Sequence, residues 1–205
     1  MRNKLKCILI LGLICLIGIT ANSADKFTLI KNRINSATIV RFGVLITIES
    51  KIFDEVDSLT GLILLAKDGR YRAELGDDIY LSDGMTNWEY SAENNQATKR
   101  ELSDGEIADN RLAFFKDLDS YYSSSIVEKD LIYTLIRLKN SDEALPDSMT
   151  VYISNKTMQI SKIEYYDLNE DLNSVYITEE FYEDKIEENL FNLNLPDSVE
   201  IISLP

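Results

Sequence analysis

Residues 37–49 (ATIVRFGVLITIE) read as one long strand that carries apolar side chains at both sets of alternate positions. Successive side chains of a strand point to opposite faces of the sheet. The two faces of this strand carry, in turn, Val40, Phe42, Val44, Ile46 and Ile48, and Ile39, Arg41, Gly43, Leu45 and Thr47. A strand with one face in water would be polar on that face. We therefore expect a sheet that is covered, or curled around something, on both sides.

Further strands follow this one at short intervals. Residues 59–75 contain two strands around Asp68-Gly69, a strong hairpin signal. A strand at 78–81 and a hairpin at 82–98 come next, and no spacing typical of parallel strands joined by helices occurs. Strand-like alternation continues at residues 126–139, 149–154, 160–167, 175–181 and 190–195. The sequence predicts a mainly β fold: a single antiparallel sheet of about ten or eleven strands in chain order.

The hairpin at 82–98 (SDGMTNWEYSAENNQAT) holds the only tryptophan of the chain. Asp83-Gly84 supplies a turn, and the alternation places Thr86, Trp88 and Tyr90 on one face. Aromatic side chains that alternate along a strand are usually part of a packed core. By composition alone we interpret this hairpin as core.

Two segments have a helical pattern. In residues 25–36, Phe27, Ile30 and Ile34 recur at helical spacing among polar residues, which predicts an N-terminal helix covering one side of the sheet. In residues 103–122, Ile107 and Leu118 bound a second apolar stripe. Residues 123–125, three serines, are interpreted as a linker into the next strand.

Residues 1–24 have the pattern of a secretory signal peptide: three basic residues, an apolar run from Cys7 to Ile19 and small residues near Ala24. An uncleaved membrane anchor is the alternative, but the apolar run is short for a span. We expect cleavage and a single mature domain of residues 25–205, which is long enough for a sizeable core.

The mature chain contains neither histidine nor cysteine, because both cysteines, Cys7 and Cys15, lie in the signal. This excludes serine–histidine and cysteine–histidine catalysis, disulfides and the common zinc sites, and we expect no enzyme and no cofactor. Loss of three basic residues with the signal leaves 18 basic against 35 acidic residues, a net charge of −17. So acidic a surface argues against nucleic acid and anionic membranes as partners.

Two acidic groupings are weighed and set aside. Asp167, Asn169 and Asp171 have the spacing of the first calcium ligands of an EF-hand loop, but Leu172 and Thr178 stand where that loop needs glycine and glutamate. We interpret the segment as a polar turn and expect no metal. The acids at 179–188 could pair for glycoside hydrolysis, although such a run is more typical of a solvated edge.

The hairpin residues also resemble a known family. Asp83-Gly84, Thr86, Trp88, Tyr90 and Gln96-Ala97-Thr98 are similar in spacing to a segment of the periplasmic outer-membrane lipoprotein carrier (LolA) family. The order of elements and the ending from Phe191 through Pro196 to Ile202 resemble that family too. The resemblance implies an incomplete, strongly curved β-barrel whose apolar interior is closed by helices and receives the acyl chains of lipoproteins.

The resemblance also implies roles for particular residues. The acyl-chain cavity and its helical lid would be formed by Val40, Phe42, Val44, Leu62, Leu64, Trp88, Tyr90, Leu112, Phe114 and Phe115. Lys67 stands in the place of the basic residue to which the family's ligand handover is attributed, and Arg70 could share that role. Asp68 replaces the family's proline after it, and Ser198 replaces a glycine of the closing motif.

The function implied is that of a monomeric periplasmic carrier without catalysis. Its partners would be lipoprotein cargo, an inner-membrane ABC exporter and an outer-membrane acceptor. Two alternatives remain open at the level of sequence: a carrier of another amphiphile such as a glycolipid, and an envelope sensor or interaction domain built on the same half-barrel.

Overall fold

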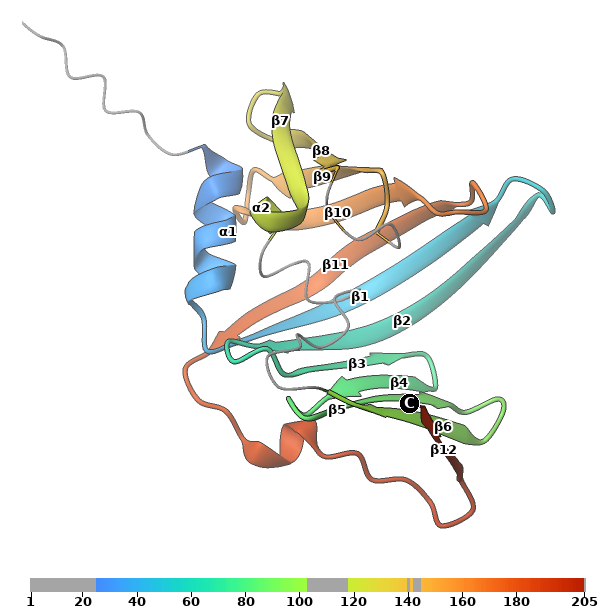
Figure 1. Ribbon diagram of the computed structural model, residues 1–205. Coiled ribbons are helices and arrows are strands. Elements are labelled where there is room, and N and C mark those ends of the chain that lie inside the picture. Colours follow the sequence, from blue (N-terminus) through green and yellow to red (C-terminus); the bar gives the residue numbers. More distant parts are fainter. Residues whose placement is uncertain (1–24, 103–117, 140, 142–144, 205) are drawn as a thin grey trace, which may run out of the picture.

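A computed structural model of the protein describes residues 25–102, 118–139, 141 and 145–204. Within these residues, twelve strands form one mixed sheet in the order β12-β6-β5-β4-β3-β2-β1-β11-β10-β9-β8-β7 (Figure 1). The strands are β1 (Ile39–Ser50), β2 (Glu55–Ala66), β3 (Tyr71–Leu75), β4 (Asp78–Ser82), β5 (Thr86–Ser91), β6 (Gln96–Glu101), β7 (Tyr122–Glu128), β8 (Ile132–Arg137), β9 (Ser148–Ser154), β10 (Gln159–Tyr166), β11 (Leu172–Glu183) and β12 (Glu200–Leu204). The described helices are α1 (Lys26–Ser36), α2 (Leu118–Tyr121) and the 3₁₀ helix η2 (Glu188–Phe191).

Strand β1 lies in the middle of the sheet and divides it into two meanders. From β1 the chain runs outward through β2 to β6, and from β7 it returns inward until β11 pairs with β1. Every neighbouring pair is antiparallel except β12, which lies parallel to β6. The described sheet is open, with β7 and β12 at its edges. The predicted antiparallel meander is thus confirmed for β1 to β6 and for β7 to β11. The expected single chain order is wrong, because β6 and β7 are not neighbours and β1 pairs with β11, and the strand count was one or two too low.

Helix α1 covers one face of the sheet, as predicted from residues 25–36. It begins at Lys26, after the N-cap residue Asp25, whose carboxylate accepts a hydrogen bond from the Thr28 amide at 2.9 Å and so caps the first turn. Phe27, Ile30 and Ile34 are buried against the sheet. Each such side chain contributes about 1.5–3 kcal/mol by leaving water. Packing therefore holds the helix in place.

Both faces of β1 are covered, in agreement with its two apolar faces. The main core lies on the α1 side and contains Val40, Phe42 and Val44. A smaller cluster on the opposite side packs Ile39, Leu64 and Ala66 around Phe191. Phe191 belongs to the segment 184–199, which links β11 to β12 and passes beneath the sheet in Figure 1. We call this segment the strap.

Three predictions about strands need correction. Residues 126–139 were expected to form one strand, but β7 and β8 occupy this region and a turn separates them at Lys129 and Asp130, both with positive φ. Residues 123–125, the expected linker, lie within β7, where pairing with β8 holds these serines in the sheet. Residues 190–195 are not a strand: the strap turns through η2 here and buries Phe191, and the last strand, β12, begins at Glu200.

Candidate ligand-binding face

The register of the sheet decides which apolar side chains face α1. Direct partners in an antiparallel pair have their side chains on the same face. Phe42 pairs with Ile63, and Ile63 pairs with Ala73. All three belong to the main core, so this row and its alternate neighbours define the face covered by α1. We call it the α1 face.

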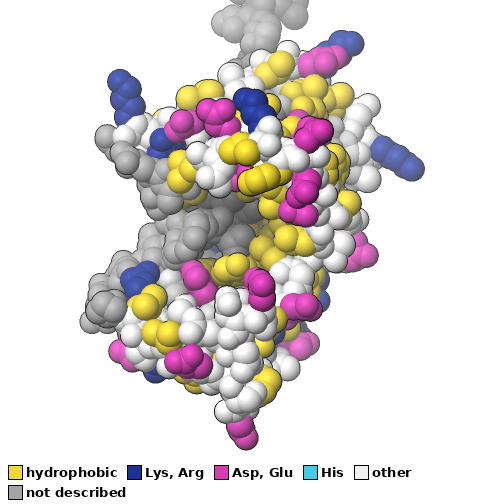
Figure 2. Space-filling model, turned by 90° about the vertical axis from the view of Figure 1, so that its right-hand side faces the viewer, with side chains coloured by type: hydrophobic (Ala, Val, Ile, Leu, Met, Phe, Trp, Pro, Cys, Tyr) yellow, Lys and Arg dark blue, Asp and Glu magenta, His cyan; other side chains and the backbone are white. Residues whose placement is uncertain are grey.

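Val40, Phe42 and Val44, three of the predicted cavity residues, lie on the α1 face but are almost fully buried. Beside them runs a series of apolar side chains that are only partly buried: Tyr80, Leu75, Ile46, Ile177 and Tyr165. They come from β4, β3, β1, β11 and β10, which are five of the six neighbouring strands from β4 to β10. Figure 2 shows a hollow on one side of the molecule with hydrophobic side chains along part of its wall. Partly buried apolar side chains of this kind can cover an apolar ligand without new exposure of the core.

Leu62, Leu64, Trp88 and Tyr90 lie on the opposite face. Leu64 pairs with Arg41, and Trp88 pairs with Leu81. Arg41 and Leu81 are on the face of the sheet that points away from α1. The structure therefore divides the predicted cavity residues between two faces. Leu62, Ile63, Leu64 and Leu65 of β2 are all apolar, so the sequence alone does not say which alternate pair faces α1. Only the register of strand pairing decides this.

Leu62 and Leu64 instead line a cleft of about 270 Å³ between the sheet and the strap. Arg41 and Arg72 enter this cleft, but both are already paired. The Arg41 guanidinium lies 2.9 Å from Glu183, and that of Arg72 lies 2.7 Å from Glu74. Arg72 also donates a hydrogen bond to the Asn192 carbonyl at 3.0 Å. The hydrogen bond from Arg72 to Asn192 fixes the strap to the sheet.

The two predicted handover residues have different surroundings. Lys67 is exposed just beyond β2, and its backbone amide donates to the Thr38 carbonyl. The Arg70 guanidinium forms an ion pair with the Asp68 carboxylate at 2.9 Å and lies 4.9 Å from the centre of the Phe191 ring. Burial raises the pKa of Asp68, but hydrogen bonds from Arg70 outweigh it and leave the pKa below its ordinary value. Arg70 thus fastens the turn after β2 to the strap.

Leu112, Phe114 and Phe115, the residues of the predicted lid, lie outside the described residues. The lid stays a prediction.

A buried polar group lies on the α1 face where α1 ends. The side chain of Glu180 is 1% exposed, accepts a hydrogen bond from the Tyr182 hydroxyl and lies 3.8 Å from the Arg33 guanidinium. Burial raises the pKa of Glu180, although Tyr182 and Arg33 both act to lower it. Among the described residues, one Glu180 oxygen and the Arg33 Nε have no hydrogen-bond partner. The group ties α1 to β11 at a cost in desolvation.

The acidic grouping at residues 167–171 has a structural role. One oxygen of Asp167 accepts hydrogen bonds from the amides of Asn169 and Asp171 at 2.8 and 3.1 Å, which makes this segment the polar turn between β10 and β11. Within the part of the chain that the structure describes, no three histidine, cysteine or acidic side chains are grouped so that they could hold a metal ion. No described helix is long and apolar enough to cross a membrane.

No protein-family model matches the sequence, and no curated protein matches it. Solved structures do match the fold. An uncharacterised conserved protein from Thermus thermophilus is 11% identical with a TM-score of 0.51, over 87% of this chain and 99% of that one. A LolA superfamily protein from Nitrosomonas europaea is 8% identical with a TM-score of 0.45, over 83% and 99%.

A chain of the MucA/MucB complex from Pseudomonas aeruginosa is 12% identical with a TM-score of 0.45, over 87% of this chain and 63% of that one. The structural neighbours of this chain thus include the LolA superfamily, which its sequence resembles. At these identities the likeness concerns the fold alone.

Proposed function

We propose that this protein is a periplasmic carrier that shields the acyl chains of lipoproteins on its α1 face and moves them from the inner to the outer membrane. The sheet curves around the ligand as an incomplete barrel, and no catalysis takes place. The signal-like pattern of residues 1–24 and the resemblance of the hairpin at 82–98 to the LolA family support this proposal. The observation that carries it is the series of partly buried apolar side chains contributed by five strands to the α1 face.

The physical demand on such a carrier is large. Removing an acyl chain from a membrane exposes apolar surface at about 0.8 kcal/mol per methylene group. A chain of about fifteen methylenes therefore costs about 12 kcal/mol unless another apolar surface covers it. Ile46, Ile177 and Tyr165 offer such a surface, while the buried Phe42 and Val44 beside them keep the core intact.

Adjacent residues of β1 provide a matched test. Ile46 lies on the α1 face and Leu45 on the other, and both are partly buried. Replacing Ile46 by Asp places a charge among the proposed acyl-chain contacts, so the affinity for a fluorescent fatty-acid probe should fall at least tenfold. Leu45→Asp puts the same charge on the opposite face and should leave the affinity unchanged. Equal losses in the two variants would count against an acyl-chain site on the α1 face.

The cargo needs a separate experiment. Native mass spectrometry of the mature protein from its own periplasm should detect a bound lipid-modified protein. A bound free lipid would indicate a carrier of another amphiphile. The mature protein should also release lipoproteins from spheroplasts, and an envelope sensor would not do so.

A further inference from the structure

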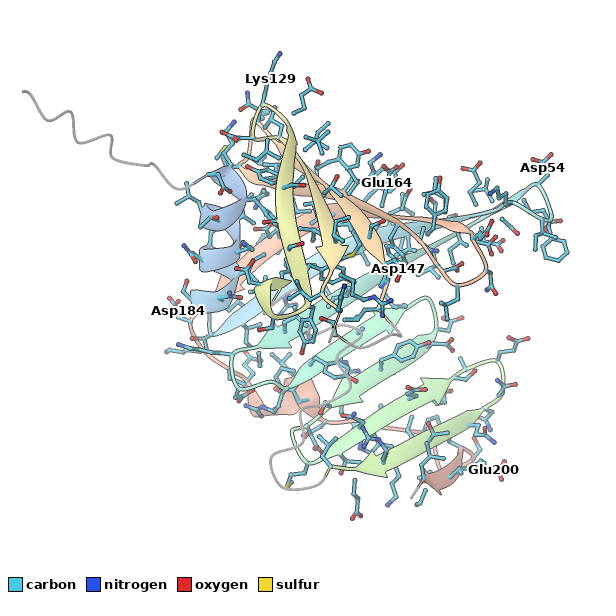
Figure 3. All side chains as sticks on the ribbon, turned by 45° about the horizontal axis from the view of Figure 1, so that its top comes forward. Asp54, Lys129, Asp147, Glu164, Asp184 and Glu200 are labelled. Carbon is cyan, nitrogen blue, oxygen red and sulfur yellow. The ribbon has the colours of Figure 1, made fainter. Side chains whose placement is uncertain are left out.

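The hairpin of β1 and β2 extends beyond the packed body of the sheet. Glu55, Val56, Asp57 and Ser58 in the outer part of β2 are exposed. Figure 3 shows Asp54 at the far end of this hairpin, away from the other labelled residues. Ile52 and Phe53, the residues before it, are 75% and 72% exposed. An isoleucine and a phenylalanine at the end of a projecting hairpin contribute nothing to the described core.

A second turn lies beside the first. The Lys51 amide donates to Asp171 at 3.2 Å, and the Lys51 ammonium lies 3.3 Å from Glu170, so the β10–β11 turn is held next to the β1–β2 turn. This second turn exposes Leu168, which is 90% exposed, and Tyr166. We call the end formed by these two turns the apolar tip. Its large exposed side chains are Ile52, Phe53, Val56, Tyr166 and Leu168.

We propose that the apolar tip docks the protein reversibly on the surface of a zwitterionic lipid bilayer. The tip projects from the sheet and is built from two separate turns (Figure 1), and a bilayer interface accepts apolar side chains of any shape. Tyr166 stands behind Leu168 near the base of its turn, and tyrosine favours the boundary between headgroups and acyl chains. The docking does not require that the carrier hold a ligand, and so it goes beyond the proposed function.

The charges around the tip select the kind of bilayer. Asp54, Glu55 and Asp57 accompany the first turn, and Asp167, Glu170 and Asp171 belong to the second. The only basic residue among them, Lys51, is paired with Glu170. Anionic headgroups repel such a cluster, whereas the headgroups of phosphatidylcholine and phosphatidylethanolamine carry no net charge and do not. A few apolar side chains also bind weakly compared with an acyl anchor, so the protein can leave again.

Vesicle flotation with the mature protein tests this inference. The protein should float with vesicles of phosphatidylcholine and phosphatidylethanolamine, and added phosphatidylglycerol should weaken this binding. Ile52→Ser with Phe53→Ser should lower the partition coefficient at least tenfold, because two large apolar side chains are lost from the interface. Met85, 73% exposed at the turn between β4 and β5, is the matched control, and Met85→Ser should bind like the unchanged protein.

Four results would overturn the inference: no flotation with zwitterionic vesicles, tighter binding with phosphatidylglycerol, equal loss in the Met85 variant, or no loss in the tip variant. A fifth such result would come from sedimentation analysis. If the unchanged protein is a dimer and the tip variant is a monomer, the tip serves self-association and not membrane docking. The fatty-acid probe separates this test from that of the proposed function. The tip variant should keep its affinity for the probe, and Ile46→Asp should keep its affinity for vesicles.

Discussion

Replacing Phe191 by Ala tests how the strap is attached to the sheet. The phenyl ring is 2% exposed, packs against Ile39 and Leu64, and lies under the Arg70 guanidinium. A buried Phe→Ala change costs about 3–5 kcal/mol through lost burial and the cavity left behind. Loss of the cation–π contact adds about 0.5–1 kcal/mol. We expect the free energy of unfolding to fall by about 4 kcal/mol, and Tm by about 8–16 °C for a chain of this size.

The assay is urea unfolding followed by circular dichroism, with Phe53→Ala as control. Phe53 is exposed at the apolar tip, so its loss should change the free energy of unfolding by less than about 0.5 kcal/mol. Phe191→Leu, which keeps most of the volume, should cost less than about 1.5 kcal/mol and remains measurable if the alanine variant fails to fold. A loss below about 1 kcal/mol in Phe191→Ala, or one equal to that of Phe53→Ala, would refute the packing argument.

Two further predictions concern the close approach of neighbouring strands and the buried acid of the α1 face. An alanine at Gly61 would place its Cβ 2.5 Å from the Glu74 carbonyl oxygen, whereas at Gly43 the nearest atom is the Thr178 hydroxyl at 2.9 Å. Gly61→Ala should therefore lower the free energy of unfolding in urea by about 1–3 kcal/mol, and Gly43→Ala should lower it less. Equal losses in the two variants would contradict the close approach of β2 and β3. Because burial raises the pKa of Glu180 above its ordinary 4.5, the folded protein binds this proton more tightly than the unfolded chain, so stability should fall as pH rises from 4.5 through the folded pKa. Glu180→Gln should unfold at higher urea than the unchanged protein at neutral pH and flatten this dependence, and an unaltered pH profile would rule the explanation out.

Much of the fold follows from local patterns in the sequence. The helix at 25–36, the strand at 37–49 and the Asp68-Gly69 turn were predicted within a few residues, because periodicity and turn chemistry act over short distances. The turn at Lys129 and Asp130 was missed, since lysine rarely adopts positive φ and no glycine or asparagine accompanies Asp130. The strap was misread because the alternation of its apolar residues, from Leu190 to Leu195, also fits a strand.

Which residues face the candidate site is set by how the strands pair with one another. Val44 and Leu62 are both apolar residues of apolar strands, yet Val44 pairs with Gly61, so Leu62 faces the other way. No local pattern sets that register. Ile177, which pairs with Val44 across the β-bulge at Gly43/Val44, was recognised as part of a strand but not as a neighbour of the site. Its partner lies more than a hundred residues earlier in the chain.

The pairing of β1 with β11 has a consequence for how the chain acquires its structure. Ile39 is opposite Glu183, so these two neighbouring strands lie 144 residues apart in the sequence. Contacts so distant in sequence form slowly, because the loop between them must be ordered first. Until β11 arrives, β1 presents a long apolar edge able to pair with another chain. A molecule that is still folding is therefore prone to aggregation during this interval, and truncation before Leu172, which removes β11, should leave β1 without this partner.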